Sequence, residues 1–309
     1  MGLLPNRLRG TSGITDMPLQ DAHDDHRRPA ASWFVFAASV KRVAILLFFF
    51  CAALVLLMVF LEERFIFFPT PYDGSAAWHP QGVDYQDVEF HAADGTRLHG
   101  WYLPHPAPRA VVLHCHGNAG NIAGRINMAK QLHALGLSVL LFDYRGYGRS
   151  EGSPNEMGVL QDARAARARL AQLAGVTESD VVLMGRSLGG AVAVDLAAHD
   201  GARGLILEST FTNLADAAAV HYRWLPVRLL LRSRFDSLAK MPAYQGPLFQ
   251  SHGNADRVVP LDLGRRLYEA SEQVEGRGKH FYLIKGGDHN EFPPHAYYEQ
   301  LDQFIDSLP

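Results

Sequence analysis

The sequence predicts an α/β fold in which helices cover both faces of a mainly parallel sheet. Short apolar runs alternate with helix-compatible stretches, and this alternation is typical of parallel strands joined by helical crossovers. The runs occupy residues 110–114, 138–142, 181–184, 204–207, 247–251 and 281–284. Two earlier runs, residues 88–91 and 98–103, flank the turn dipeptide Asp94-Gly95 and predict an antiparallel hairpin at the start of the domain.

The composition is that of a globular chain with one large α/β domain or two small ones. Its 309 residues are 48% hydrophobic, which is enough for a sizeable core. The net charge of -3 leaves no basic face of the kind that binds nucleic acid, so nucleic acid is not an expected partner. Cys51 and Cys115 fall in an apolar segment and in a predicted buried strand, so no disulfide framework is expected.

Residues 43–61 are all apolar and predict a single transmembrane helix. At ~1.5 Å per residue such a helix is roughly 28 Å long, close to the thickness of the hydrocarbon layer. A buried core helix is the alternative, but helices of soluble proteins normally keep a polar stripe, and this segment has none. A cleaved signal peptide is a further alternative. The run is long for one, however, and Glu62-Glu63-Arg64 follows it in place of a small-residue cleavage site.

The residues on either side of this helix predict the domain organisation. Residues 1–42 are expected to form a flexible tail, and residues 62–82 a membrane-proximal linker to a globular domain of residues 83–309. Whether the apolar residues 65–69 rest at the membrane interface or pack under the domain is left open. Positive charges on the N-terminal side predict a cytoplasmic N-terminus and an extracytoplasmic domain, periplasmic in a Gram-negative bacterium. These charges are Arg27, Arg28, Lys41 and Arg42, against Arg64 alone on the other side.

The stretch Gly185-Arg186-Ser187-Leu188-Gly189 has the pattern of a nucleophile elbow. It joins a predicted buried strand to a helix-compatible run over residues 188–198. A sharp strand-to-helix turn brings the positions two before and two after the serine close together, and glycine at both removes the collision. Such a pentapeptide also occurs by chance, so the strand-turn-helix context carries the prediction that Ser187 is a nucleophile.

Residues 116–121 form a glycine-containing loop after another predicted strand. The backbone N–H of Asn118 in this loop and that of Leu188 after the nucleophile are the candidate oxyanion donors. An ordinary tight turn is the alternative. A phosphate loop is disfavoured because no Gly-Lys-Ser/Thr follows.

A serine nucleophile needs a base with a pKa near neutrality and a carboxylate to orient that base. His289 follows the last predicted strand in a glycine-led loop, and Asp256 follows the strand at residues 247–251. The order Ser187, Asp256, His289 is workable for this fold class. Glu208 is a rival acid, Asp288 is too near His289 in sequence to orient it easily, and helix capping is the alternative role for Asp256.

Other polar residues at the same sheet edge have structural explanations. His114 and His116 are spaced so that both could face one side, but no third and fourth ligand with metal-site spacing accompanies them. No metal or organic cofactor is expected. Asp143 and Arg145, in a glycine-punctuated loop, are expected to be structural ion-pair partners.

Five ordered motifs resemble one family. Gly-Arg-Ser-Leu-Gly-Gly, His-Gly-Asn-Ala-Gly-Asn, Asp-Tyr-Arg-Gly-Tyr-Gly-Arg-Ser-Glu-Gly, Gly-Asn-Ala-Asp-Arg-Val-Val-Pro and Gly-Gly-Asp-His-Asn together are similar to those of membrane-anchored serine hydrolases of the alpha/beta-hydrolase fold. The similar branch contains depalmitoylating and lysophospholipase members and uncharacterised bacterial relatives. The resemblance runs from Arg64 to the C-terminus. It implies Ser187, Asp256 and His289 as the triad, with Asn118 and Leu188 at the oxyanion hole.

Residues 211–240 depart from the regular α/β alternation and predict a small helical cap over the site. The segment contains leucines, Trp224 and several arginines. This composition is typical of a surface that contacts a membrane, or alternatively of an amphipathic helix packed on the core. The whole pattern predicts hydrolysis of a carboxylic ester or thioester, on an acyl or lipid-like substrate near a membrane, through an acyl-enzyme. The alternatives are acyl transfer or aminopeptidase activity by the same triad, or a non-catalytic membrane-anchored binding module.

Overall fold

The computed structural model describes residues 29–272 and 278–309. The chain divides into two compact units, residues 1–54 and residues 55–309. Within the described residues, α1 (Pro29–Phe60) begins well before the predicted apolar span, because Pro29 suits a first helical turn and helix-compatible residues follow it. Lys41 and Arg42 therefore lie inside the helix. The part of the predicted tail before residue 29 lies outside the described residues.

Part of α1, Trp33–Phe60, is long and apolar enough to cross a membrane. No other helix among the residues that the structure describes meets this condition. Trp33–Phe60 contains 28 residues. At ~1.5 Å rise per residue this helix exceeds the thickness of a typical hydrocarbon layer, roughly 30 Å.

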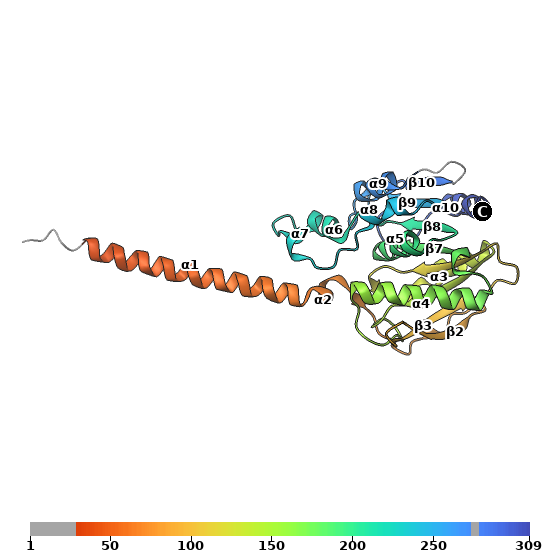
Figure 1. Cartoon of the computed structure of the whole chain (residues 1–309), viewed down its shortest axis with the longest axis horizontal. Coiled ribbons are helices and arrows are strands. Elements are labelled where there is room, and N and C mark those ends of the chain that lie inside the picture. Colours follow the sequence, from red (N-terminus) through yellow and green to blue (C-terminus); the bar gives the residue numbers. More distant parts are fainter. Residues whose placement is uncertain (1–28, 273–277) are drawn as a thin grey trace, which may run out of the picture. The chain divides into compact units, whose positions relative to one another are not determined.

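The second unit is built on an eight-stranded sheet with the order β10-β9-β8-β7-β4-β6-β3-β2 (Figure 1). Strand β3 is antiparallel to both β2 and β6, and the remaining neighbours are parallel. The predicted hairpin and the six predicted parallel strands are therefore confirmed. Their bounds are β2 Gln86–His91, β3 Arg97–Leu103, β4 Ala110–Cys115, β6 Leu137–Asp143, β7 Val181–Arg186, β8 Gly204–Glu208, β9 Leu248–Gly253 and β10 Lys279–Ile284.

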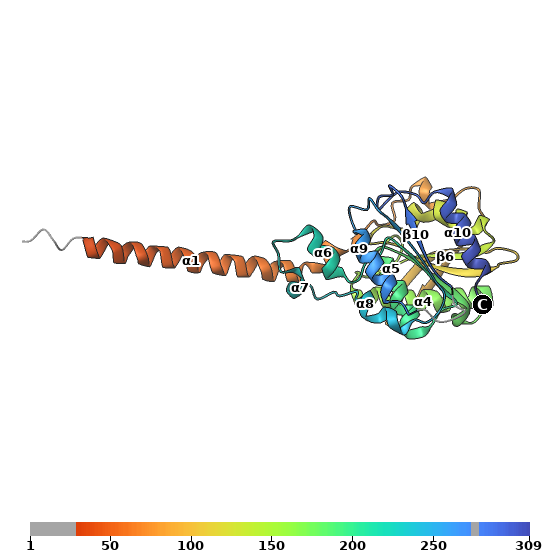
Figure 2. The ribbon, with the colours of Figure 1, turned by 90° about the horizontal axis from the view of Figure 1, so that it is seen from above.

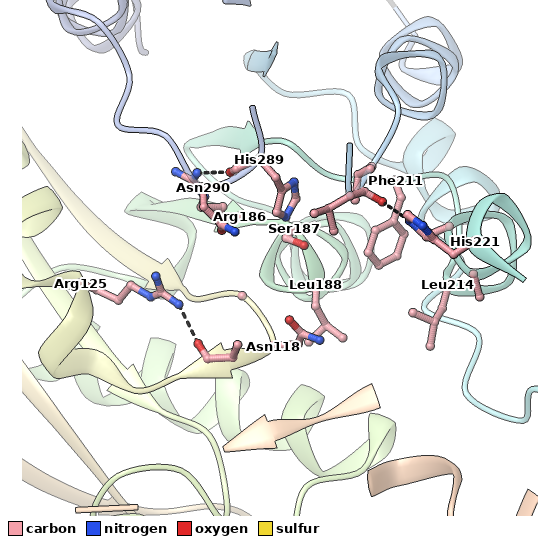
Figure 3. A pocket seen from close by; sticks show the side chains of 16 residues that line it. Asn118, Arg125, Arg186, Ser187, Leu188, Phe211, Leu214, His221, His289 and Asn290 are labelled. Atoms are coloured by element: carbon pink, nitrogen blue, oxygen red, sulfur yellow. Dashed lines mark hydrogen bonds between the residues drawn. The ribbon is translucent and has the colours of Figure 1, made fainter. Parts of the chain in front are cut away.

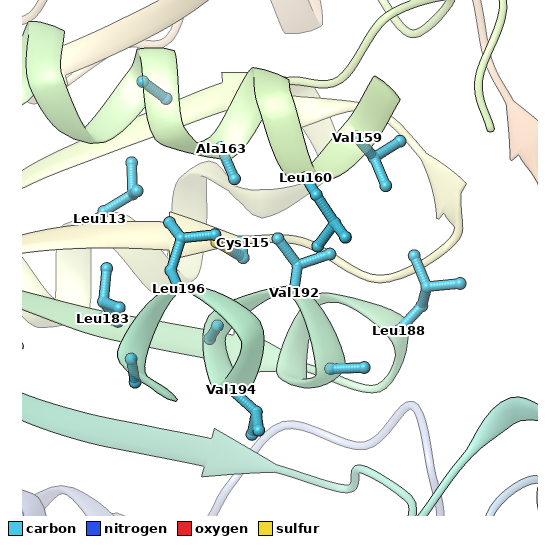
Figure 4. Packing of buried hydrophobic residues seen from close by; sticks show 14 of the residues in the cluster. Leu113, Cys115, Val159, Leu160, Ala163, Leu183, Leu188, Val192, Val194 and Leu196 are labelled. Carbon is cyan, nitrogen blue, oxygen red and sulfur yellow. The ribbon is translucent and has the colours of Figure 1, made fainter. Parts of the chain in front are cut away.

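Helices cover both faces of the sheet, as predicted. They are α3 Ile126–Ala134, α4 Glu156–Ala174, α5 Leu188–Asp200, α9 Leu261–Ala270 and α10 His295–Asp306. One buried cluster joins α4, α5 and α9 to strand residues such as Leu113 and Leu183, and Figure 4 shows α4 and α5 packed together over these strands. The other cluster joins α3 and α10 to the opposite sheet face, with α10 across the sheet from α4 in Figure 2. Because alternate residues of a central strand pack into the two clusters, these strands are mostly apolar on both faces.

The predicted cap region contains three short helices, α6 Leu214–His221, α7 Val227–Leu230 and α8 Ser237–Lys240. Asn213 caps α6, where its side chain accepts a hydrogen bond from the backbone N–H of Asp216 at 2.8 Å. Pro226 stands directly before α7, where its fixed φ and missing N–H are tolerated at the start of a helix. Arg228 and Asp216 join α7 to α6 through an ion pair of 2.9 Å.

Residues 62–82, expected to be a linker, are structured and packed against the domain. They form α2 Glu62–Ile66, β1 Phe68–Pro69 and the 3-10 turn Ala76–Trp78. Ile66, Phe67 and Trp78 are buried, so this segment packs on the domain, whereas Phe65 and Phe68 stay exposed. Strand β1 pairs in parallel with β5 (Ala119–Gly120), which lies in the loop that carries Asn118.

Candidate active site

Ser187 sits at the sharp turn between β7 and α5. Its backbone has φ 53° and ψ -120°, a conformation that a non-glycine residue rarely adopts. A Cβ at Gly185 would collide with the carbonyl of Gly189, and one at Gly189 would collide with the carbonyls of Cys115 and His116. The structure therefore contains the strained turn that the glycine spacing predicts.

A pocket of about 280 Å³ opens above Ser187 (Figure 3). It brings together four of the five predicted site residues, because Asn118, Ser187, Leu188 and His289 all line it. The fifth, Asp256, does not line the pocket, and its carboxylate contacts the His289 ring. In Figure 3 the His289 ring points toward the Ser187 side chain. The Ser187 hydroxyl has no hydrogen-bond partner among residues 29–272 and 278–309, and catalytic hydrogen bonds of unliganded enzymes often tighten only when substrate binds.

The Asp256 carboxylate orients His289. Its Oδ2 is 2.7 Å from His289 Nδ1, while Oδ1 accepts backbone N–H groups of Val258 at 2.9 Å and Val259 at 2.8 Å. Burial by itself raises the pKa of Asp256, but hydrogen bonds from His252, His289 and Val259 outweigh burial and hold that pKa well below its usual range. The carboxylate is thus ionised. Asp256 both caps the following turn and binds the imidazole, so its two candidate roles coexist.

The two rival carboxylates are engaged elsewhere. Glu208 accepts a hydrogen bond from the Tyr297 hydroxyl at 2.5 Å and lies 3.7 Å from the Arg186 guanidinium. Asp288 binds the Arg257 side chain at 2.8 Å and the backbone N–H of His289. Neither contacts the imidazole ring, so Asp256 is the carboxylate that the geometry pairs with His289.

The peptide that carries the Asn118 N–H is oriented by His116. His116 Nδ1 is 2.7 Å from the carbonyl oxygen of Gly117, and since that oxygen can only accept, Nδ1 carries the proton. Burial lowers the pKa of His116 to about 3, so the ring is neutral. In a trans peptide the C=O and N–H groups point in opposite directions. Holding the Gly117 carbonyl therefore fixes the direction of the Asn118 N–H.

The Leu188 N–H is oriented in the same way from the other side. The carbonyl of Ser187 accepts hydrogen bonds from the Thr210 hydroxyl at 2.8 Å and from the backbone N–H of Gly190 at 2.9 Å. Within the described part of the chain, neither the Asn118 N–H nor the Leu188 N–H has an acceptor. Two fixed and unpaired donors beside one hydroxyl are what a developing oxyanion requires.

The remaining polar residues at this edge of the sheet take structural roles. The described residues contain no group of three or more His, Cys, Asp or Glu side chains that could hold a metal ion. Arg145 forms the expected ion pairs, with Asp162 and Asp94, both at 2.8 Å. Asp143 differs from the expectation, because it has no Lys or Arg partner within the described segments and accepts the backbone N–H of Ile122 at 2.9 Å. Burial raises its pKa to about 7.

The structure adds two arginines that the sequence motifs did not indicate. Arg125 and Arg186 line the pocket above Ser187, and Figure 3 shows them on the side of Ser187 away from Leu214. Burial, and then the nearby Arg186, lower the pKa of Arg125. No Asp or Glu side chain is among the described residues that line this pocket. Arg186 precedes Ser187 directly, so its position could be expected, whereas that of Arg125 depends on the course of the loop after Asn118.

Comparisons with known proteins show which family this chain is similar to. Residues 106–240 match the family model described as serine aminopeptidase, S33, a stretch that contains Asn118, Ser187 and Leu188 but ends before Asp256 and His289. An uncharacterized protein of Mycobacterium tuberculosis is 41% identical over 234 residues, covering 74% of this chain and 81% of that protein. The alpha/beta hydrolase domain-containing protein WAV2 of Arabidopsis thaliana is 32% identical over 234 residues, covering 68% and 76%.

A lipase and a solved esterase are also similar. The lysophosphatidylserine lipase ABHD12 of Danio rerio is 33% identical over 239 residues, which cover 69% of this chain and 60% of that protein. The structure of the Pyrococcus furiosus esterase Pf2001 aligns with a TM-score of 0.65 at 19% identity, covering 78% of this chain and 99% of the esterase. The last similarity shows the shared fold. With its elbow, its sheet and these relatives, the chain belongs to the alpha/beta hydrolase family.

Proposed function

We propose that the protein is a serine hydrolase that cleaves a carboxylic ester or thioester through an acyl-enzyme, with Ser187, His289 and Asp256 as its triad. The observation that carries this proposal is the 2.7 Å pair of His289 and Asp256 beside a serine that is held in an elbow. The relative named as a lipase and the esterase of the same fold support an ester substrate.

The proposed mechanism uses groups already in place. His289 takes the proton of Ser187 as Oγ attacks the acyl carbonyl, and Asp256 stabilises the imidazolium that forms. The tetrahedral oxyanion accepts hydrogen bonds from the N–H groups of Asn118 and Leu188. His289 then protonates the departing alcohol or thiol. Water, deprotonated by His289, attacks the acyl-enzyme and releases the carboxylic acid and free Ser187.

Aminopeptidase activity is the second candidate, because the matching family model carries that description. A substrate for this activity presents a protonated α-amino group, which a carboxylate would have to bind in the pocket. The pocket instead has Arg125 and Arg186 and, among its described lining residues, no carboxylate. This electrostatic environment favours neutral or anionic esters over a cationic N-terminus.

The apolar helix supports a membrane location for this chemistry. In our proposal the apolar part of α1, residues 43–60, crosses the membrane in a single pass, with Lys41 and Arg42 at its cytoplasmic end and the catalytic unit on the extracytoplasmic side. Protease is added to sealed vesicles whose cytoplasmic face is outward. It should leave the catalytic unit intact and digest it only after the vesicles are opened. Digestion from the cytoplasmic face would contradict this orientation.

Ester hydrolysis is tested with full-length protein in detergent and p-nitrophenyl butanoate as substrate. Ser187→Ala should lower kcat by several orders of magnitude, because nucleophile loss removes the action of the whole triad. Ser153→Ala, at an exposed serine, is the matched control and should keep wild-type activity. An aminoacyl p-nitroanilide measures the second candidate in the same assay. Ester hydrolysis that survives Ser187→Ala would overturn the proposal.

A further inference from the structure

A second cavity, of about 340 Å³, lies within the unit of residues 55–309 next to the catalytic pocket. Its wall comes from the last turn of α1, from α2 and β1, and from the cap helices α6 and α7. Its volume falls at the small end of the range for ligand pockets, roughly 300–1,000 Å³. The mechanism above does not use this cavity.

The cavity adjoins the pocket at Ser187. Asn118, Leu214 and Ala218 line both the catalytic pocket and the second cavity. Asn118 is also the residue whose N–H is placed at the oxyanion hole. In our reading an acyl group with its carbonyl at Ser187 extends past Leu214, at this shared wall, into the cavity. In Figure 3, Leu214 lies on the side of Ser187 opposite Arg125, so the apolar path leaves the pocket away from its positive end.

The inside of the cavity is hydrocarbon in character. Glu62 and Asn118 are the two charged or amide side chains among its described lining residues, and the others are aliphatic or aromatic apart from the Met58 thioether and the Tyr222 hydroxyl. The Glu62 carboxylate accepts backbone N–H groups of Arg232 at 3.0 Å and Ser233 at 2.7 Å. Burial alone raises the pKa of Glu62, but these hydrogen bonds exceed the effect of burial and lower the pKa. The Asn118 side chain donates to the Ile66 carbonyl at 2.8 Å.

The α2 and β1 residues that form one wall are fixed to the catalytic machinery. The backbone N–H of Phe68 donates to the Asn118 carbonyl at 3.0 Å, and the Tyr147 hydroxyl donates to the same oxygen at 2.7 Å. Glu62 joins this wall to the chain that follows α7. Since α2 begins two residues after the apolar helix ends at Phe60, the cavity wall is covalently continuous with the membrane-spanning candidate.

Exposed apolar side chains gather on the same elements. Phe65 of α2 is 61% exposed, and Leu229 of α7 is 85% exposed, next to Leu230, which lines the cavity. Large apolar side chains in such exposure favour contact with lipid.

We propose that this cavity is the acyl-chain subsite and that its occupant is the hydrocarbon chain of a membrane-borne ester or thioester. The inference rests on the proposed hydrolase function and specifies its substrate class. The carbonyl lies at Ser187, the chain runs past Leu214 between α2 and the cap, and the alcohol or thiol part lies toward Arg125 and Arg186.

The test measures kcat/KM of full-length protein in detergent for p-nitrophenyl esters from acetyl to tetradecanoyl. Leu230→Trp fills the cavity, Leu230→Ala enlarges it, and Leu229→Trp places the same bulk on the neighbouring exposed position as a matched control. Because a buried methylene contributes a factor of about four, loss of two or more from the cavity costs roughly tenfold. Labelling by a fluorophosphonate probe checks that each variant keeps a folded catalytic centre.

We expect wild-type kcat/KM to increase at least tenfold from acetyl to a longer optimum. Leu230→Trp should lower the ratio of dodecanoyl to butanoyl activity by roughly tenfold or more. Leu229→Trp should keep the wild-type ratio, and Leu230→Ala should move the optimum to longer chains. If Leu230→Trp does not label, an unchanged optimum in Leu230→Ala overturns the inference by itself.

Three results separate the inference from the function on which it rests. A flat chain-length profile with active wild-type protein, or identical profiles for the two tryptophan variants, overturns the acyl subsite and leaves the hydrolase intact. Absence of both hydrolysis and labelling in the wild type overturns the proposed function, and the acyl subsite with it.

Discussion

His116 Nδ1 donates a hydrogen bond to the carbonyl oxygen of Gly117 over 2.7 Å, and this contact fixes the peptide whose N–H belongs to Asn118. The His116 ring also packs on Tyr144 and Tyr147, with centroid separations of 4.5 and 5.2 Å. One buried and neutral imidazole thus links the aromatic core under the sheet edge to the proposed oxyanion hole. In the proposed mechanism His116 acts only by positioning this peptide.

His116→Phe keeps the ring packing and removes the donor. Because the Asn118 N–H then loses its fixed direction, we expect kcat for a p-nitrophenyl ester to fall roughly 10- to 100-fold while KM changes little. His116→Gln retains a donor and should recover part of the loss. A purely structural role would instead lower the thermal midpoint of both variants and leave kcat unchanged in the folded fraction.

Asp256→Asn keeps the shape of the side chain but removes the charge that selects the His289 tautomer. By analogy with triads in general, kcat should fall by about 10³- to 10⁴-fold. Steady-state kinetics across several pH values measure this loss. A decrease of less than about tenfold would assign the orienting role to another group.

The same variant tests the depressed pKa of Asp256. Its folded pKa lies below the unfolded value of about 3.9, so the carboxylate contributes stability that is present above that pH. This contribution is lost as the pH falls through the folded pKa. Between pH 5 and 2 the thermal midpoint of the wild type should therefore fall more steeply than that of Asp256→Asn. Parallel curves would show that the carboxylate is not stabilised in the folded state.

Much of the fold can be predicted from the sequence because the strands in the middle of the sheet share one local pattern. A strand buried on both faces is a short apolar run, and β4, β6, β7 and β8 each appear as one. The α2 and β1 segment could not be predicted in this way. Its two-residue strand has no periodicity, and its partner Ala119–Gly120 is distant in the chain, so tertiary contact alone defines it.

The candidate site was likewise predictable only in part. Ser187 could be predicted because an elbow imposes glycine at fixed offsets, and His289 because it follows a strand that ends at the ligand-binding edge. The roles of His116 and Thr210 could not, because each acts through a carbonyl oxygen that any residue carries. The position of Arg125 likewise depends on the folded path of its loop.

Gly189→Ala should disrupt the elbow itself. The added Cβ meets backbone carbonyl oxygens of Cys115 and His116, which no side-chain rotation can relieve. We expect destabilisation by roughly 1–3 kcal/mol and loss of activity. Gly124→Ala is the matched control, since a Cβ there meets nothing within 4 Å, and its thermal midpoint should equal that of the wild type. Equal midpoints for both variants would contradict the steric account of the elbow.

Arg125→Gln tests the charge of the catalytic pocket. Two guanidinium groups there should lower the KM of an ester that carries a carboxylate on its alcohol part, relative to an uncharged isostere of the same acyl chain. The variant should reduce this preference about two- to fivefold. High salt should reduce it in the wild type as well. A preference that neither the substitution nor salt affects would have another origin.

The most direct measurement for the central claim is the site of covalent labelling by a fluorophosphonate probe, mapped by peptide mass spectrometry on full-length protein. We predict one adduct on the peptide that contains Ser187, absent from Ser187→Ala and formed far more slowly in Asp256→Asn, which retains the nucleophile but not the oriented base. An adduct on a different residue, or undiminished labelling of Ser187→Ala, would contradict the assignment of Ser187 as the nucleophile.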